Sequence, residues 1–203
     1  MTIRIAEART QAEREALFAF RYRIYVEEMN RPQKYADHGR RRIEDPLDKS
    51  GTNFVAWAGE SIVGCVRVNF CRDGGTAYYE ELLHMADVGP TFREDSSICT
   101  RLMVAPEFRK SRLATHLSCA CFQLGRENRI RWNFIDCNDH LVRFFERMGY
   151  VKTHDVVHEE YGSVNVMRFD LEGVDRLRSM NSIFVRLAMA RSQPLAEGQG
   201  KVA

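Results

Sequence analysis

Apolar side chains recur with two different spacings along this chain, and each spacing predicts one kind of element. Continuous or alternating apolar runs predict β-strands at residues 2–6, 54–57, 61–70, 98–104, 132–137, 151–157 and 164–170. Apolar positions three and four residues apart predict helices at residues 10–29, 79–85, 110–128, 139–148 and 175–191. The order of these elements predicts an α+β fold around a central, mixed and mostly antiparallel sheet flanked by helices.

The first helix carries a clear start signal, and the segment after it has a different character. Thr10 stands at the position of a helix cap, and Glu13 three residues later completes a capping box. Residues 30–50 hold few apolar side chains and many charges. We therefore expect a long ordered loop there, and long loops inside compact domains usually serve a function.

The chain length of 203 residues suits one domain with a small appendage. We expect this domain to span residues 1–172, a C-terminal helix to span 173–192, and residues 193–203 to form a disordered tail. The N-terminal residues do not have the pattern of a signal peptide, and no apolar run approaches the length of a membrane span.

Charge and cysteine content narrow the classes of partner. The 30 basic and 28 acidic residues give a net charge of +2, which is too balanced for a general nucleic-acid-binding protein. The six cysteines contain no C-x-x-C pair and no spacing typical of zinc, so we predict no metal site and a reducing, cytoplasmic setting. Basic residues gather at 40–42 and between 101 and 131, as ordinary solvated surface or as a site for an acidic or phosphorylated partner.

The most informative segment spans residues 101–114. An apolar strand ends at Pro106, and a short basic loop with Arg109, Lys110 and Arg112 leads directly into a helix. The first backbone amides of a helix have no partner within the helix, and together with the helix dipole they favour an anion. The segment is therefore a candidate phosphate-binding loop.

The segment Val104-x-Pro-x-x-Arg109-x-x-x-Leu-Ala114 and the later segment 141–150, which ends in Gly149-Tyr150, resemble motifs of a known family. They are similar to the acyl-donor loop and the helix-to-strand motif of the GNAT acyltransferase superfamily. In that superfamily the strand before the loop pairs with the pantetheine arm of the donor, and the loop amides hold its phosphates. The resemblance therefore implies these donor-binding residues: Leu102, Met103 and Val104 on the strand, and Arg109, Lys110, Ser111, Arg112, Leu113 and Ala114 in the loop.

Two positions depart from the pattern of the superfamily. Arg112 stands where the first glycine of the loop is usual, and glycine lets a backbone approach a pyrophosphate closely. This departure indicates a donor with a different head, such as one phosphodiester in place of complete coenzyme A. Phe145 stands where a tyrosine often protonates the leaving thiolate, so a side chain at this position cannot supply that proton.

The N-terminal half of the chain adds three motifs in a fixed order. They are Arg21-Tyr-x-x-Tyr25 on the first helix, Asp45-x-x-Asp48, and Gly64-x-x-Arg67. In this order they resemble the acyl-homoserine-lactone (autoinducer) synthases and, more closely, the bacterial N-acyl amino acid synthases, over residues 15–170. Both families move a fatty acyl group from acyl carrier protein to an amine.

This resemblance implies a set of catalytic and acceptor-binding residues. Arg101 matches the arginine of a Glu-x-x-Arg motif, and Glu80 and Glu81 are the candidates for a general base. The implied acceptor-binding residues are Arg21, Arg23, Tyr25, Asp45, Asp48 and Arg67. Arginine forks suit the carboxylate of an amino acid, and aspartates suit its amine. The same charges also suit a structural cluster of ion pairs that fixes the long loop on the sheet.

We therefore expect an N-acyltransferase that moves a fatty acyl group from acyl carrier protein to the amine of an amino acid. It would hold no permanent cofactor, and its donor would be an acyl-phosphopantetheine carried by acyl carrier protein or coenzyme A. The basic final helix would pack on its own domain, dock the carrier protein or contact a membrane.

Three alternatives stay open. The first is an autoinducer synthase that uses S-adenosylmethionine, although Ile98 replaces the glutamate of its Glu-x-x-Arg motif. The second is an acetyl-CoA N-acetyltransferase, against which Arg112 and Phe145 both count. The third is not an enzyme but an inactive GNAT-like domain that senses acyl carriers.

Overall fold

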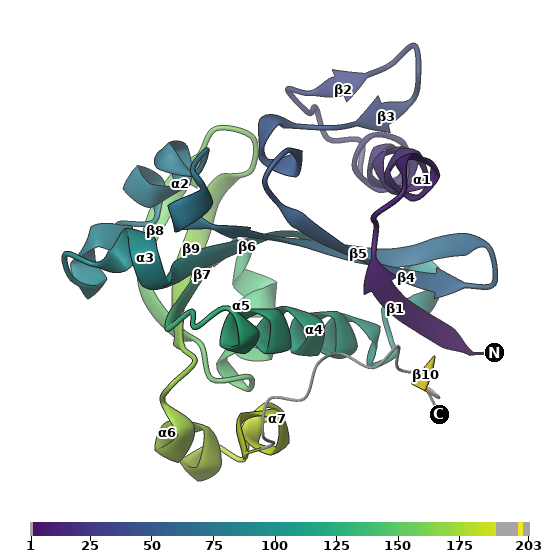
Figure 1. The fold of residues 1–203 in the computed structure, drawn as a ribbon. Coiled ribbons are helices and arrows are strands. Elements are labelled where there is room, and N and C mark those ends of the chain that lie inside the picture. Colours follow the sequence, from purple (N-terminus) through teal and green to yellow (C-terminus); the bar gives the residue numbers. More distant parts are fainter. Residues whose placement is uncertain (1, 190–198, 201–203) are drawn as a thin grey trace. The chain divides into compact units, whose positions relative to one another are not determined.

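The structure is a computed structural model that describes residues 2–189 and 199–200. The chain divides into two compact units. The first unit contains Met1–Arg67, Arg101–Ala120 and Leu195–Ala203, and the second contains Val68–Thr100 and Cys121–Pro194. Both units combine strands of a mixed, mostly antiparallel sheet with flanking helices, so the predicted α+β class is confirmed (Figure 1). The expectation that residues 1–172 form one domain stays a prediction.

Helix α1 (Gln11–Tyr22) begins at the predicted capping box. The Thr10 hydroxyl accepts from the Glu13 amide at 3.2 Å, and the Glu13 carboxylate accepts from the Thr10 amide at 2.9 Å. The sequence pattern predicts a helix that continues to residue 29, but after Tyr22 it widens into a π-helix, η1 (Arg23–Glu28). In a π-helix each amide donates five residues back, which puts more residues into every turn.

The first unit contains β1, β4, most of β5 and the end of β6, which are neighbours in that order. Their bounds are Ile3–Glu7, Thr52–Ala58, Ser61–Phe70 and Ser96–Val104. β1 and β4 are antiparallel, and Gly59 adopts the left-handed conformation that the tight turn between β4 and β5 requires. Where β6 ends, the amide of Ala105 donates to the carbonyl of Val63 at 2.9 Å, so the beginning of β5 lies beside the end of β6.

The expected loop at residues 30–50 contains short regular elements that its composition did not reveal. A two-residue hairpin forms from β2 (Ala36–Asp37) and β3 (Arg42–Ile43). A 3₁₀ turn, η2 (Pro46–Asp48), follows it. Buried Ile43 is one of the few apolar side chains that hold this segment on the protein.

The second unit contains the beginning of β6 and three further strands in the order β7, β9, β8. Their bounds are Trp132–Cys137 for β7, Val151–His158 for β8 and Gly162–Asp170 for β9. β6 and β7 run parallel with Ile98 opposite Phe134, whereas β7 and β8 both pair antiparallel with β9. The parallel pair makes the sheet mixed, as predicted.

Helices connect these strands. The bounds are Ala77–Leu82 for α2, Phe92–Asp95 for α3, Leu113–Glu127 for α4 and Asp139–Glu146 for α5, with 3₁₀ turns η3 (Cys71–Asp73) and η4 (Met85–Val88). In the core of the second unit the rings of Phe122 and Phe184 stack with centroids 4.7 Å apart, and Phe169 meets both rings edge-on. α3 was not predicted. No described helix is long and apolar enough to cross a membrane.

The final helix differs from the prediction of one continuous element at residues 175–191. Two short helices, α6 (Val174–Ser179) and α7 (Val185–Met189), replace it. Asn181 takes the left-handed conformation between them, and the Ser182 hydroxyl donates to the Met148 carbonyl at 2.5 Å. This buried anchor brings Phe184 into the core, which a straight helix would not allow. The tail expected at 193–203 lies outside the described residues, apart from β10 (Gln199–Gly200), which pairs with β1.

Candidate functional site

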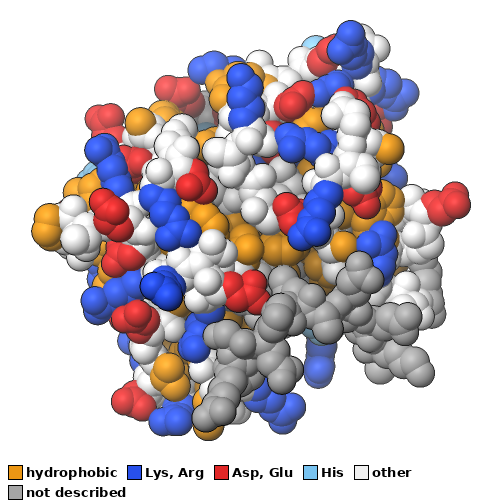
Figure 2. Space-filling model, viewed as in Figure 1, with side chains coloured by type: hydrophobic (Ala, Val, Ile, Leu, Met, Phe, Trp, Pro, Cys, Tyr) orange, Lys and Arg blue, Asp and Glu red, His pale blue; other side chains and the backbone are white. Residues whose placement is uncertain are grey.

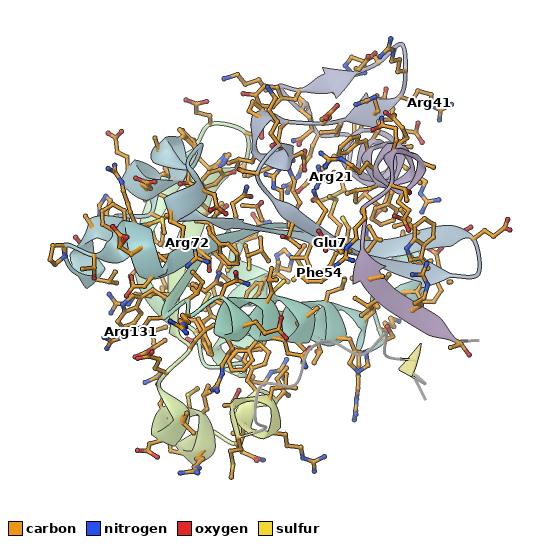
Figure 3. The ribbon with its side chains drawn as sticks, in the orientation of Figure 1. Glu7, Arg21, Arg41, Phe54, Arg72 and Arg131 are labelled. Carbon is orange, nitrogen blue, oxygen red and sulfur yellow. The ribbon has the colours of Figure 1, made fainter. Side chains whose placement is uncertain are left out.

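A chain of buried ion pairs runs through the first unit. Arg21, labelled on α1 in Figure 3, donates to Asp48 at 2.7 Å. Arg67 on β5 lies 2.5 Å from Asp45 and 3.1 Å from Asp48. Arg101 on β6 lies 2.9 Å from Asp45. The structure therefore brings five of the predicted site residues together, and their side chains are at most 6% exposed.

The two aspartates owe their positions to the turn between them. In η2 the Asp45 carboxylate accepts from the Leu47 amide at 3.0 Å, and the Asp48 carboxylate accepts from the Asp45 amide at 2.9 Å. Each aspartate thus caps the turn and still presents oxygens to arginines. The chain after the turn passes so close to its neighbours that only glycine fits at position 51. A Cβ there would lie 2.8 Å from the Leu47 carbonyl and 2.9 Å from the Arg67 side chain.

The arginines keep both aspartates ionised. Burial alone raises the pKa of a carboxyl, and burial is the largest influence on Asp45 and on Asp48. The positive charges of Arg67 and Arg101 outweigh it at Asp45, and those of Arg21 and Arg67 outweigh it at Asp48. Both pKa values consequently lie below the ordinary value, so neither carboxylate is suited to take a proton near neutral pH.

Arg101 forms the other end of this chain of ion pairs. Its Nη1 donates to the side-chain oxygen of Gln33 at 2.6 Å, and its guanidinium lies over the ring of half-buried Tyr25 at 5.1 Å. Gln33 was missed because a glutamine in a charged loop belongs to no motif. The only signal for it was that the loop at 30–50 was expected to be functional.

The backbone of Arg101 is unusual for a residue within a strand. Its φ is 59°, in the left-handed region that side chains other than glycine rarely adopt. Its carbonyl accepts from the Cys65 thiol at 3.4 Å. Backbones of this kind cost on the order of 1–3 kcal/mol and concentrate at active sites, where surrounding contacts maintain them. The ion pairs of the Arg101 side chain are such contacts.

Arg23 is the predicted acceptor-binding residue that the structure separates from the others. Its exposed side chain donates to the Ile62 carbonyl at 3.3 Å and lies 5.2 Å from the centroid of the Phe20 ring. There it borders an open hollow of about 370 Å³ in the first unit. The hollow is lined by Ala16, Ala19, Phe20, Tyr22, Arg23, Glu27, Arg40, Arg41, Ser61 and Ile62.

The predicted donor loop follows the end of β6. A 3₁₀ turn, η5 (Pro106–Phe108), leads to Arg109, Lys110, Ser111 and Arg112, which are all exposed. The Ser111 hydroxyl donates to the Phe108 carbonyl at 2.6 Å and accepts from the Leu113 amide at 3.2 Å. The Leu113 amide, the first of α4 and one of those expected to face an anion, is therefore already bonded.

The beginning of α4 packs on the strands through a close approach at Gly64. A Cβ on Gly64 would lie 3.1 Å from the Leu117 side chain and from the Met103 carbonyl, and 3.3 Å from Leu113. The glycine of the Gly-x-x-Arg motif therefore holds the donor loop close to β5. Arg67 of the same motif belongs to the ion pairs, so one short motif serves both the loop and the buried charges.

Glu80 and Glu81, the candidate bases, lie on α2 of the second unit. The Glu80 carboxylate accepts from the Thr76 hydroxyl at 2.7 Å and from Arg93 at 2.8 Å, whereas Glu81 is exposed. Ile98 and Phe145, which replace polar residues of related motifs, are both buried. Their replacement therefore leaves no polar atom without a partner at these two positions.

A mixed sheet with a strand that ends in a basic loop before a helix, beside buried arginines and aspartates, defines a GNAT-like acyltransferase. Comparison with protein families identifies it further. Residues 16–168 match the family model described as N-acyl amino acid synthase FeeM, and the chain belongs to this family. The protein is therefore an N-acyltransferase.

Solved structures show the same fold at low sequence identity. FeeM, an N-acyl amino acid synthase from uncultured soil microbes, has a TM-score of 0.63 and 15% identity, over 92% of this chain and 99% of FeeM. The CoA-dependent acyl-homoserine lactone synthase MesI has a TM-score of 0.66 and 18% identity, over 97% and 100%. BjaI is also a CoA-dependent acyl-homoserine lactone synthase and was solved with SAM and isopentyl-CoA. It has a TM-score of 0.65 and 18% identity, over 90% of this chain and 90% of BjaI. No curated protein sequence matches the chain.

Proposed function

We propose that the protein transfers a fatty acyl group from the phosphopantetheine thioester of acyl carrier protein to the amine of an amino acid. The observation that carries the proposal is the course of β6. This strand holds the Arg101 guanidinium at one point, and Leu102, Met103 and Val104 lead from there directly into the basic donor loop. One strand therefore connects a site for a carboxylate with a site for a phosphate.

The acceptor would bind at the end of the ion-pair chain formed by Arg101, Tyr25 and Gln33. Arg21, Arg67 and Asp48 are almost fully buried against one another, so they support this end and hold the loop with Asp45. A guanidinium presents five N–H groups in a planar fork, which suits a carboxylate. Arg101 is thus the proposed binding group for the carboxylate of the amino acid.

The reaction needs a neutral amine and a leaving thiolate. The amine nitrogen attacks the thioester carbonyl, the C–S bond breaks, and the proton lost by the amine ends on the sulfur of phosphopantetheine. An α-amino group has a pKa of about 7.7–8.0, so a weak base acting through water suffices. Glu80 and Glu81 remain the proposed bases, and backbone amides near Arg101–Met103 are the proposed donors to the oxyanion.

The hollow beside β5 supports acyl carrier protein as the donor. Its lining contains Arg23, Arg40 and Arg41 together with one acidic residue, Glu27, which pairs with Arg41. Its wall at Ile62 adjoins the end of β6, since the next carbonyl, that of Val63, accepts from the Ala105 amide. Acyl carrier proteins are acidic, and charge complementarity steers such encounters. Basic and acidic side chains are intermixed on the face drawn in Figure 2. The proposed enzyme would act in the cytoplasm.

A membrane contact of the product-forming enzyme is a second proposal, for the C-terminal helices. Met180, Ile183 and Met189 are exposed apolar side chains on or beside α6 and α7. Arg176, Arg178 and Arg186 lie in the same segment. Apolar and basic side chains together are typical of helices that lie on anionic lipid.

One alternative acceptor has an observation in its favour. BjaI, a structural neighbour, was solved with SAM. An autoinducer synthase would couple the acyl group to S-adenosylmethionine and release a homoserine lactone. The same purified reactions distinguish the two acceptors.

The test combines purified protein with lauroyl acyl carrier protein or lauroyl-CoA, and with either the standard amino acids or S-adenosylmethionine. Products are identified by mass spectrometry. We expect N-lauroyl amino acid from the carrier-protein donor, and roughly tenfold less product from Arg101→Ala because a hydrogen bond to a charged group is lost. Arg9→Ala is the control, since Arg9 is exposed on the surface. A homoserine lactone, or product only from lauroyl-CoA, would contradict the proposal.

A further inference from the structure

The arginine of the donor-loop motif, Arg109, is held from two sides. Its Nε donates to the Val104 carbonyl at 3.1 Å, and its Nη2 lies 2.5 Å from Oε1 of Glu28. Glu28 is the last residue of η1 and is far from the loop in sequence. The side chains of Glu28 and Arg109 are 28% and 46% exposed, so the pair is partly shielded yet open to a ligand.

The π-helix explains why Glu28 reaches the loop. In η1 the Met29 amide donates to the Ile24 carbonyl five residues back. This wider turn gives the following side chains directions that a continued α-helix would not give them. The two adjacent glutamates at its end have different partners: Glu27 pairs with Arg41 in the β2–β3 connection, and Glu28 pairs with Arg109. Turns of this type are frequent at functional sites.

The two contacts leave Arg109 able to bind a ligand. A guanidinium has five N–H groups, and Val104 and Glu28 accept one each, which leaves three on Nη1 and Nη2. Groups on two neighbouring nitrogens suit a bidentate contact with a phosphate. An exposed arginine without such supports would have to give up side-chain freedom when the ligand binds.

We propose that Glu28 is a positioning residue for the acyl donor. It holds the Arg109 guanidinium in the orientation that receives the phosphate of phosphopantetheine, and it acts only through Arg109. This inference rests on the proposed function for the identity of the ligand at the donor loop. It adds a residue of the first helix to donor recognition, outside every motif of the loop.

The test measures binding rather than turnover, by calorimetry of the full-length protein with two probes, 4′-phosphopantetheine and coenzyme A. Glu28→Ala should raise the Kd of both probes roughly 3- to 10-fold, the range expected when one side chain loses its preorganisation. Arg109→Ala should raise Kd further. In the Arg109→Ala background, Glu28→Ala should not raise the Kd further, because the arginine through which Glu28 acts is absent.

Glu15→Ala is the matched control, since it removes another glutamate–arginine ion pair of the first helix, that with Arg42, and should leave Kd unchanged. Thermal unfolding of all variants checks that the fold is intact. An unchanged or lowered Kd in Glu28→Ala, an equal effect in the Arg109→Ala background, or no probe binding by the wild type would each overturn the inference. Absence of N-acyl amino acid product with the expected binding pattern would overturn the proposed function and leave this inference standing.

Discussion

The first unit holds two groups of charged residues that differ in almost every physical respect. Arg21, Asp48 and Arg67 are buried, and each has an ion partner among the others. Arg109, Lys110 and Arg112 are exposed, and the contacts of Arg109 use only part of its guanidinium. Burial makes the first group costly to alter, and exposure makes the second group available to a ligand.

The comparison shows why residue type alone does not reveal a role. Both groups are arginine-rich, and both belong to motifs that resemble binding sites. A buried arginine that is already paired supports its neighbours, whereas an exposed arginine with unused N–H groups can receive a phosphate. Arg101 stands between the two groups, because it is paired with Asp45 yet belongs to the strand that leads to the donor loop.

The largest expected effect comes from breaking the buried group. Asp48→Ala removes the carboxylate that faces Arg21 and Arg67, so buried Arg21 loses its ion pair and Arg67 keeps only its ion pair with Asp45. We expect a loss of about 3–5 kcal/mol in the free energy of unfolding, measured by urea denaturation. Asp155→Ala, which removes an exposed aspartate 2.8 Å from Lys152, is the control and should change stability by less than about 0.5 kcal/mol. Equal effects of the two substitutions would contradict the structural role.

A substitution in the donor loop should affect donor binding and leave stability nearly unchanged. Arg109→Ala should raise the donor KM about 10- to 100-fold, as for loss of a hydrogen bond to a charged group. Its stability should stay within about 0.5 kcal/mol of wild type because the side chain is exposed. Steady-state kinetics with lauroyl acyl carrier protein, together with urea denaturation, measure both. A stability loss with an unchanged KM would show that Arg109 has a structural role, like that of the buried group, and does not bind the donor.

Acid should reduce the contribution of the buried group to the free energy of unfolding before it affects the donor loop. The pKa of Asp48 is lower in the folded protein than the ordinary value of about 3.9, so the unfolded chain takes up the proton first. Stability from Asp48 is therefore complete above about pH 5 and falls as the pH drops toward the folded pKa. We expect this residue to account for about 1 kcal/mol lost by about pH 3. Asp48→Asn should flatten that part of the pH profile, and an unchanged slope would contradict the assignment.

The smallest expected effect concerns the choice of donor. Arg112→Gly restores the residue usual in the superfamily loop and lets a backbone approach a pyrophosphate. We expect the Kd of coenzyme A to fall severalfold relative to that of 4′-phosphopantetheine, measured by calorimetry. Lys110→Ala is the control for loss of one exposed charge in the same loop. A parallel change for both ligands would show that Arg112 does not discriminate between them.

Local sequence signals predicted most of the fold. The Thr10–Glu13 capping box indicated the start of α1, and apolar periodicity placed β7 at the observed bounds. The break between α6 and α7 was not predictable, because it depends on a bond from Ser182 to a carbonyl at Met148, distant in sequence. Tertiary contacts of this kind leave no periodic trace.

The candidate site was predictable to a similar extent. The motifs identified Asp45, Asp48 and Arg67, whose proximity the structure shows. They did not identify Gln33 or Glu28, because these residues act through arginines and the sequence does not record which side chain an arginine faces. The proposed bases and the separate position of Arg23 also depend on three-dimensional placement.

The turn between the two aspartates has a consequence for how such motifs arise. A spacing of three residues is what a reciprocal cap of a short helix needs, whatever charges lie nearby. Asp-x-x-Asp can therefore act as the start signal of a short helix even where no arginine lies nearby. A serine in place of Asp45, with a glutamate in place of Asp48, would retain the backbone signal while removing one of the two charges. Sequence searches built on this spacing alone will collect turns as readily as enzymes.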